Sequence, residues 1–368
     1  MKKSFYPKLL KRVLAVKSFK AFGFPETVPY KLTFVITNKC NSHCKMCFVW
    51  KFYKDHPEKA KNELKPSEIK KIIDSVKDDI YWLNFTGGEP TLRIDLPEIV
   101  EYAAKKCKNL GMINFPCNGL MPERVYSVYK EIAEKAPKNI EVYVTLSLDG
   151  PEKVHDYMRG TPGAYKNVMK AFRLLKPLEK KHKNFHVNFQ ATITRYNINQ
   201  FKKHFDFIQS LSDFNIITFE HEAELFKNIG KDFSKASKKE YNKKLIDNLQ
   251  YVIRKIKVSS PQRVIQSIYL KLAITYVKTK KLPIPCASSF ASITVDSFGD
   301  VIPCAFVGKP AGNVRKYKYD MKKILSGKLA KEMQAKIKAG ECPTCWMNCE
   351  AYPSIFESFP TAFLKSLK

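Results

Sequence analysis

The sequence has no long apolar run and no secretion signal. None of its segments approaches the ~18 consecutive apolar residues of a membrane-spanning helix. The basic start MKKSFYPKLLKRVLAVKSFK resembles the opening of a signal peptide, but Lys11, Arg12, Lys17 and Lys20 interrupt every candidate apolar core. We therefore expect a cytoplasmic protein whose thiols stay reduced.

Cysteine is too scarce for a disulfide-stabilised scaffold. Ten cysteines among 368 residues fall far below the ~8–10% that is typical of small disulfide-rich proteins. In a reducing compartment, clustered cysteines are interpreted as metal ligands before disulfides.

Acidic residues are also few, with 35 aspartates and glutamates against 65 lysines and arginines. The formal charge of +30 predicts an acidic partner, such as nucleic acid, an anionic membrane, an acidic protein or a phosphorylated substrate. The charge does not select among them. Apolar residues make up 44% of the chain, which excludes a disordered protein.

Short apolar strands alternate with helical stretches over the first two thirds of the chain. The strands are predicted at 30–37, 80–86, 112–117, 141–148, 186–194 and 215–220. This alternation predicts parallel βαβ units with right-handed crossovers. Two helical segments follow up to about residue 281, and then a cysteine-rich segment with the hairpin-like sequence SITVDSFGDVIPC.

Three cysteines directly follow the first predicted strand, in the segment TNKCNSHCKMCFVW. Cys40, Cys44 and Cys47 form the pattern C-x3-C-x2-C. Three thiolates on one short loop can bind three irons of a [4Fe–4S] cube and leave the fourth iron open to another ligand. The same loop could bind zinc if His43 supplied a fourth ligand.

A glycine-rich turn follows the second predicted strand, in the segment FTGGEP. Gly87 and Gly88 permit close backbone approach, and Glu89 supplies a carboxylate. Such a turn is common by itself. Because ligands of parallel α/β folds bind at the carboxyl ends of the strands, we expect the turn and the cysteine loop at the same barrel mouth.

These paired motifs resemble the radical S-adenosylmethionine (radical SAM) superfamily, whose signature is C-x3-C-x-Φ-C after the first strand and GGE after the second. The resemblance covers about residues 30–222. One departure is Met46, which stands where Φ is usually aromatic. Because that position would contact the adenine largely through its backbone, the departure puts little in doubt.

The resemblance implies a role for each residue of the two motifs. The three cysteines would bind three irons of a [4Fe–4S] cluster, and the methionine end of S-adenosylmethionine would chelate the fourth. Gly88 and Glu89, in the same turn as Gly87, would hold the methionine amine.

Residues at the later strand ends fit the same family. By this resemblance, Asn118 would face the ribose, and Ser147 would contact the ribose or the carboxylate. Asp149, in the same SLDG segment as Ser147, is a further candidate cofactor contact. Arg159 would clamp the carboxylate with its planar guanidinium, and Ile193 would pack on the adenine. Ordinary alternatives are a turn for Asn118-Gly119, a helix cap for Ser147 and Asp149, and a solvated charge for Arg159.

The family's chemistry implies both a fold and an activity. One electron passed from the cluster to the sulfonium releases methionine and a 5′-deoxyadenosyl radical, which abstracts a hydrogen atom from the substrate. The fold expected is α/β, a partial (β/α)6 TIM-like barrel followed by a helical segment and a small cysteine-rich domain. The parts expected are a basic amphipathic segment 1–29, the barrel 30–222, a helical linker or lid 223–285, an iron–sulfur domain 286–352 and a tail 353–368.

A second set of cysteines lies near the C-terminus. Cys286 and Cys304 flank the hairpin-like segment, and Cys342, Cys345 and Cys349 follow in ECPTCWMNCE. A zinc knuckle with four cysteine ligands fits this spacing. It also resembles the SPASM/Twitch extension of radical SAM enzymes in its short form, which implies one auxiliary [4Fe–4S] cluster.

The resemblance leaves the fourth auxiliary ligand open. We expect Cys286, Cys304, Cys342 and Cys345, with Cys349 as a possible replacement for one of the last pair. Sulfatase-maturing relatives carry an aspartate base where this chain has Ala305, so that role cannot be carried over.

Acidic residues and a histidine follow the sixth strand in ITFEHEAELF. Glu220, His221 and Glu222 are therefore candidate catalytic groups that could bind substrate or move a proton. Charged residues opening a solvated helix explain the same pattern equally well.

The sequence leaves the substrate open. Sugar or nucleoside oxidation, lipid chemistry and peptide or protein modification all fit. About thirty residues precede the first strand, so we expect no fused leader-peptide-binding domain. The +30 charge keeps RNA among the candidates, although no separate RNA-binding domain is readable. A non-catalytic iron–sulfur or zinc scaffold is the alternative of another class.

The N-terminal 24 residues carry seven basic side chains and no acidic one. Their apolar residues recur at helical spacing, as in a helix that lies on an anionic membrane. Alternatively, the helix packs on the bottom of the barrel and exposes its lysines. As a third possibility, the basic surface docks an acidic flavodoxin or ferredoxin that donates electrons.

Overall fold

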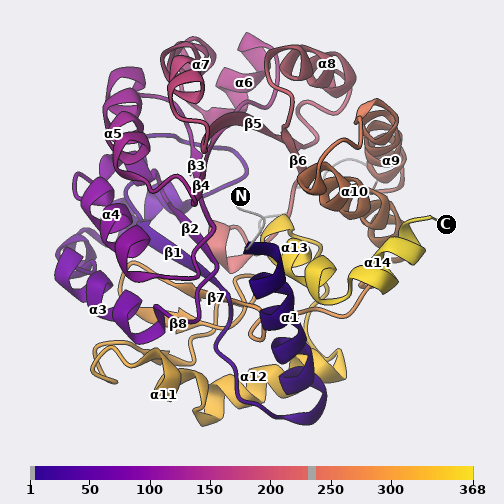
Figure 1. Cartoon of the computed structure of the whole chain (residues 1–368). Coiled ribbons are helices and arrows are strands. Elements are labelled where there is room, and N and C mark those ends of the chain that lie inside the picture. Colours follow the sequence, from indigo (N-terminus) through magenta and orange to yellow (C-terminus); the bar gives the residue numbers. More distant parts are fainter. Residues whose placement is uncertain (1–4, 231–237, 368) are drawn as a thin grey trace.

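A parallel sheet forms the centre of the computed structural model, which describes residues 5–230 and 238–367 (Figure 1). Its six barrel strands are β1 (Lys31–Thr37), β2 (Trp82–Gly87), β3 (Met112–Cys117), β4 (Glu141–Ser147), β5 (Phe185–Ile193) and β6 (Ile216–Phe219). They pair in sequence order, each parallel to the next. The predicted partial (β/α)6 barrel is therefore confirmed.

Helices cover the outer face of this sheet (Figure 1). The crossover helices are α3 (Pro66–Val76), α4 (Leu96–Lys106), α5 (Pro122–Lys135), α6 (Glu152–Arg159), α7 (Ala164–Lys181) and α8 (Phe201–Leu211). Phe34, Phe85 and Phe115 stack between neighbouring strands, with ring centroids 5.7 and 5.6 Å apart, and Phe115 also packs against Tyr129 of α5. Burial of these rings fixes the register of the first three strands against the helices.

The cysteine-rich segment continues the barrel sheet. Strand β7 (Ser292–Val295) pairs parallel with β1, and β8 (Asp300–Ile302) and β9 (Gly312–Asn313) follow as antiparallel strands. The sheet order is β6-β5-β4-β3-β2-β1-β7-β8-β9. The segment expected as a small separate domain therefore shares main-chain hydrogen bonds with the barrel.

Of the other helices that follow β1, all but one belong to the C-terminal part of the chain. They are the short α2 (Phe52–Asp55), α9 (Lys238–Lys255), α10 (Pro261–Thr279), α11 (Met321–Leu325), α12 (Lys328–Ala339), α13 (Asn348–Glu357) and α14 (Phe359–Ser366). Helix α10 packs against α9, β6, α13 and α14. It therefore covers the side of the barrel beyond its last strand.

The basic N-terminal segment forms α1 (Phe5–Phe22), which packs at the amino-terminal ends of the strands. Val13 and Val16 are buried against Tyr30, which precedes β1, and against Phe290, which precedes β7. The opposite side exposes Leu10, which is 59% accessible. This is the arrangement expected of a helix on the bottom of the barrel. Among the described residues, no helix combines the length and the apolar character needed to cross a bilayer.

Candidate active site

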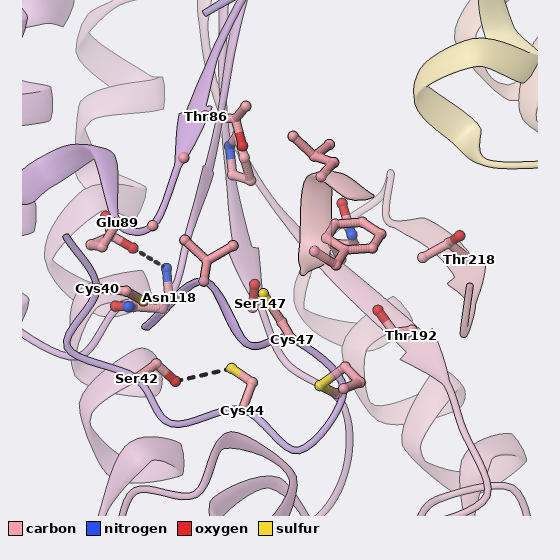
Figure 2. Close-up of a pocket in the computed structure, with 18 of the residues that line it drawn as sticks. Cys40, Ser42, Cys44, Cys47, Thr86, Glu89, Asn118, Ser147, Thr192 and Thr218 are labelled. Atoms are coloured by element: carbon pink, nitrogen blue, oxygen red, sulfur yellow. Dashed lines mark hydrogen bonds between the residues drawn. The ribbon is translucent and has the colours of Figure 1, made fainter. Parts of the chain in front are cut away.

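A cavity of about 210 Å³ opens at the carboxyl ends of the barrel strands. Every barrel strand contributes to its wall, through Val35, Thr86, Pro116, Ser147, Thr192 and Thr218 among others. The cysteine loop and the GGE turn line one side (Figure 2). Residues 347 and 348, between two auxiliary cysteines, reach the same cavity. The two motifs predicted at one barrel mouth therefore meet there.

The two glycines of the turn allow β2 to run against the cysteine loop. A Cβ atom on Gly87 would lie 2.2 Å from the carbonyl oxygen of Thr37, and one on Gly88 would lie 2.1 Å from that of Lys39. Gly87 also has φ +143°, a conformation that disfavours other residues. The backbone N–H groups of Gly88 and Glu89 donate to those same carbonyls. The turn thus positions the loop that carries the cysteines.

Glu89 is buried at the edge of the cavity. One carboxylate oxygen accepts from the backbone N–H and hydroxyl of Thr91, at 3.1 and 2.7 Å, and the other accepts from the N–H of Asn118 at 2.7 Å (Figure 2). Burial raises the pKa of Glu89, while these hydrogen bonds oppose the shift. The donors fix the orientation of the carboxylate toward the cavity.

Arg159 is held between a carboxylate and a thiol. Its Nε and Nη2 donate to one oxygen of Asp149, at 2.8 and 2.6 Å, and its Nη1 lies 3.7 Å from the sulfur of Cys44. Asp149 is fully buried and also accepts from the N–H of Thr192. Asp149, expected as a cofactor contact, therefore does not line the cavity, because its carboxylate is used to orient Arg159.

The three loop cysteines line the cavity together. Burial raises the pKa of Cys40 and of Cys47 to about 12. The hydroxyl of Ser42 lies 3.1 Å from the sulfur of Cys44 (Figure 2). Buried thiols of this kind ionise only when a metal takes the place of the proton. A donor set of sulfur alone fits an iron–sulfur cluster.

Some of the other expected cofactor contacts line the cavity, and one lies in the hydrophobic core. Met46, Asn118 and Ser147 line the cavity. Ile193 does not, because it is fully buried in the apolar core. Its neighbour Thr192 faces the cavity instead, since successive side chains of a strand point to opposite faces. The expected adenine contact at Ile193 was therefore assigned to the wrong face of β5.

Two of the three candidate catalytic residues face the cavity. Glu220 and His221 line it. Burial raises the pKa of Glu220 to about 7 and lowers that of His221 to about 3. Glu222 is exposed and accepts a long hydrogen bond from the N–H of Gly230, so the structure places it outside the cavity.

The loop after β6 links the two cysteine regions, which sequence reasoning did not anticipate. Asn228 is fully buried and donates to the carbonyls of Met46 and His221, both at 2.9 Å. In the same loop, the N–H groups of Glu224 and Leu225 donate to carbonyls next to Cys304. Phe226, on the same loop, lines the cavity. The loop therefore closes the cavity between the barrel cysteines and the auxiliary segment.

Several wall residues lay beyond the predictions from sequence. Trp50, Gln190, Thr192 and Thr218 line the cavity, as does Asn348 from α13. Gln190 and Thr192 lie two residues apart on β5 and therefore point to the same face of the strand. This period of two could have predicted both as cavity residues. No local pattern marks Trp50 or Asn348, because they reach the cavity from a short 3-10 helix and from the far end of the chain.

The five C-terminal cysteines lie close enough together to interact electrostatically. Burial raises the pKa of Cys286 and Cys349 to about 12 and that of Cys304 to about 11, and neighbouring thiols add to the shift of Cys286 and Cys349. Cys345 interacts electrostatically with Cys286, Cys304 and Cys349. Cys342 in turn interacts with Cys286. A sulfur-only donor set again fits an iron–sulfur cluster.

Among the described residues, no three His, Cys, Asp or Glu side chains converge closely enough to hold a single metal ion. A four-iron cube binds each thiolate at a separate iron atom, so its ligands need not converge on one point.

A partial barrel with a three-cysteine loop and a GGE turn at one mouth, the glutamate of that turn being buried, defines a radical SAM enzyme. Two family models match the chain, the radical SAM superfamily over residues 34–208 and an iron-sulfur cluster-binding domain, SPASM, over residues 286–350. The chain belongs to the radical SAM superfamily and carries a SPASM domain. Its cofactors are S-adenosylmethionine and iron–sulfur clusters, one in each region.

Two curated relatives match over about three quarters of the chain, and a third matches over about half of it, all at modest identity. The AdoMet-dependent heme synthase of Oleidesulfovibrio alaskensis is 27% identical, over 76% of this chain and 70% of that protein. The subtilosin biosynthesis protein AlbA of Bacillus subtilis is 26% identical, over 77% of this chain and 56% of that protein. The mycofactocin maturase MftC of Mycolicibacterium smegmatis is 30% identical, over 47% of this chain and 40% of that protein. The chain thus spans only part of their length.

Solved structures share the fold. Native anSMEcpe with bound AdoMet has a TM-score of 0.61 at 17% identity, covering 92% of this chain and 100% of that chain. The same protein with AdoMet and the Cp18Cys peptide has a TM-score of 0.60 at 19% identity, covering 92% and 98%.

Proposed function

We propose that this radical SAM enzyme modifies a peptide or protein by abstracting a hydrogen atom from a side chain bound at the β6 side of the cavity. The observation that carries the proposal is one cavity with two different sides. The cysteine loop, Glu89 and Arg159 line one side, and Glu220, His221 and Asn348 line the other. When bound, the reduced cluster and S-adenosylmethionine supply the 5′-deoxyadenosyl radical.

Residues on the cysteine side would bind the cofactor. Gly88 and Glu89 would accept the methionine amine, because the fixed carboxylate of Glu89 faces the cavity wall where that amine would bind. Arg159 would attract the methionine carboxylate through the Nη1 group that Asp149 leaves available. Asn118 would contact the ribose, and Ser147 would contact the ribose or the carboxylate.

Residues on the opposite side would bind the substrate. The Oε1 atom of Glu220 and the Nε2 atom of His221 are buried, and neither has a hydrogen-bond partner within the described residues. Buried polar atoms of this kind are normally satisfied, so a ligand that donates and accepts hydrogen bonds fits this wall. A carboxyl group with a pKa near 7 is suited to exchange a proton with such a ligand.

The peptide class is supported by the names of the relatives AlbA and MftC, a bacteriocin biosynthesis protein and a mycofactocin maturase. The heme synthase relative suggests a tetrapyrrole as the second class. A tetrapyrrole bears several carboxylates. The substrate side of this cavity carries the acid Glu220, on which the nearby Arg195 acts electrostatically, and Arg159 on the other side is already paired with Asp149. This charge distribution favours the peptide.

We further propose that the electron donor is an acidic flavodoxin or ferredoxin and that the enzyme acts in the cytoplasm. The net charge of +30 supports an acidic partner, since complementary charge accelerates docking. The packing of α1 against Tyr30 and Phe290 supports a structural role for this helix over a role in lipid binding.

The test is an anaerobic assay of the cluster-loaded enzyme with a reductant, S-adenosylmethionine and peptides encoded next to its gene. We expect 5′-deoxyadenosine to form and deuterium to move into it from a deuterated peptide. Glu220→Gln should reduce peptide product at least tenfold, whereas the exposed Glu222→Gln serves as the matched control. Full cluster content without any 5′-deoxyadenosine would contradict the proposal.

A further inference from the structure

Two lysines from outside the SPASM domain donate hydrogen bonds to the backbone of two auxiliary cysteines. The Nζ atom of Lys20, on α1, donates to the carbonyl oxygen of Cys286. The Nζ atom of Lys31, on β1, donates to the carbonyl oxygen of Cys349. Both lysines lie outside residues 286–350, which the SPASM model matches. We call Lys20 and Lys31 together the cationic clamp.

Lys31 occupies an unusual place for a lysine. It is the first residue of β1, a central strand of the sheet, and is only 2% exposed. Its ammonium lies 4.6 Å from the ring centroid of Trp82 on the neighbouring strand. Lysine is almost never fully buried without a partner, because its charge loses hydration. The Cys349 carbonyl and the Trp82 ring are partners for this charge.

Lys20 approaches the auxiliary cysteines from α1. Its ammonium lies 5.6 Å from the ring centroid of Phe290, four residues after Cys286. Burial lowers the pKa of Lys20, and the negative charge of the Cys286 thiolate opposes that shift. The ammonium of Lys20 is therefore close enough to Cys286 to interact electrostatically with a negative charge on its thiolate.

Acidic groups also face the clamp. Glu350 lies near Lys31 and accepts from the hydroxyl of Ser292, the register partner of Lys31 on β7. Glu357 lies near Lys20. Glu350 also acts electrostatically on Cys286, Cys304 and Cys349, and Lys31 opposes that effect at Cys349. The two ammonium groups are the cations hydrogen-bonded to the backbone of the auxiliary cysteines.

We propose that the cationic clamp of Lys20 and Lys31 raises the reduction potential of the auxiliary cluster. The inference rests on the proposed function only in requiring an iron–sulfur cluster at the C-terminal cysteines. A cube with four thiolates is an anion, and one added electron makes it more negative without forming or breaking a bond. Nearby positive charge therefore stabilises the reduced state, and net charge is among the factors that set such potentials.

This proposal assigns a task to the basic N-terminal helix. The interior face of α1 supplies Val13 and Val16 to the core and Lys20 to the auxiliary site. The helix would thus tune a cluster whose ligands lie more than 260 residues further along the chain.

The test is a redox titration of the cluster-loaded enzyme, with dithionite as the reductant and both clusters followed by electron paramagnetic resonance. The variants are Lys20→Met, Lys31→Met and the double variant, with iron counted in each. We expect the reduction potential of the auxiliary cluster to fall by at least about 59 mV in the double variant. This shift is a tenfold change in the equilibrium constant for a one-electron reduction. The barrel cluster is the internal control, and its potential should stay constant.

Two further variants separate charge from packing. Lys17→Met removes an exposed lysine from the same helix and should leave the auxiliary potential unchanged. Lys20→Arg keeps the charge and should restore most of the potential. If the Lys31→Met variant loses the auxiliary cluster, the Lys20→Met variant alone tests the inference. We then expect a smaller fall in the reduction potential of its auxiliary cluster. The inference is overturned if Lys20→Met and the double variant keep a full auxiliary cluster and its reduction potential does not change. An unmodified protein with no auxiliary cluster overturns its premise and that part of the proposed function.

Discussion

Single side chains around the cavity combine burial with a small number of fixed hydrogen bonds. Glu89 accepts three hydrogen bonds from Thr91 and Asn118, and Arg159 is oriented by Asp149. Neither side chain is free to turn toward bulk water. Such preorganisation lowers the cost of orienting a bound ligand, because the protein has already ordered the groups that contact it.

The first residue-scale prediction concerns the cofactor amine. Glu89→Gln should weaken S-adenosylmethionine binding about 10- to 150-fold, because the loss of one charge-assisted hydrogen bond costs about 1.5–3 kcal/mol. Iron content should not change, since Glu89 is not an iron ligand in the proposed site. Equilibrium binding to the cluster-loaded enzyme measures the effect. The exposed Glu98→Gln is the control, and equal affinity in both variants would remove Glu89 from the cofactor site.

The second residue-scale prediction concerns Glu220 and pH. Burial raises its pKa from an ordinary value of 4.5 to about 7. Between these values the folded state binds a proton that the unfolded chain has released, so stability falls as the pH rises through this window. Glu220→Gln should therefore stabilise the cofactor-free protein by roughly 1–3 kcal/mol at pH 8 and have little effect near pH 4.

Urea unfolding at both pH values, with Glu222→Gln as control, measures the difference for Glu220→Gln. A stability difference that does not change with pH would mean that Glu220 does not titrate in this window.

At the scale of elements, the function depends on the segments at the carboxyl ends of the strands. The cysteine loop comes after β1, the GGE turn ends β2, and Glu220 directly succeeds β6. Loops on a rigid sheet can vary while the strands hold their positions, which is why sites occur at this edge of parallel folds. Helix α1 contributes from the opposite edge of the barrel, where it supports the sheet.

The element-scale prediction concerns α1. Val16 is fully buried, so Val16→Ala should destabilise the protein by about 2 kcal/mol, as expected for the loss of two buried methylene equivalents. Leu14 is 56% exposed on the same helix, and Leu14→Ala should have little effect. Because the apolar face is used in packing, the enzyme should not float with anionic vesicles, even at low salt. Flotation that Leu14→Ser abolishes would restore the membrane interpretation.

At the scale of the whole molecule, one sheet joins the two cysteine regions. Strand β7 pairs with β1, and the loop containing Asn228 bridges the cysteine loop and the segment next to Cys304. The auxiliary segment therefore has a fixed position relative to the barrel. This rigid connection suits a site whose two sides come from opposite ends of the chain.

The whole-molecule prediction is a metal count. The anaerobically reconstituted protein should hold about eight irons per chain, four for each cluster. Changing Cys40, Cys44 and Cys47 to alanine together should leave about four irons and abolish reductive cleavage of S-adenosylmethionine. Elemental analysis distinguishes the alternative, because about four irons with one zinc would contradict an auxiliary cluster and leave the barrel cluster intact.

The sequence by itself determined the barrel strands, the two cysteine regions and the GGE turn. These features are local, because the spacing of Cys40, Cys44 and Cys47 and the two glycines before Glu89 depend on residues close together in the chain. Strand order was also predictable from local patterns, since short parallel units pair with their neighbours.

Only the tertiary structure decided which side chains reach the cavity. Ile193 and Thr192 are adjacent, and a shift of one residue exchanges the core face of a strand for the cavity face. Asp149 is turned toward Arg159, and Glu222 is exposed, for reasons of packing that no motif encodes. The contact of Lys20 with Cys286 joins residues that are distant in the chain, so only the folded sheet and the helix beneath it bring them together.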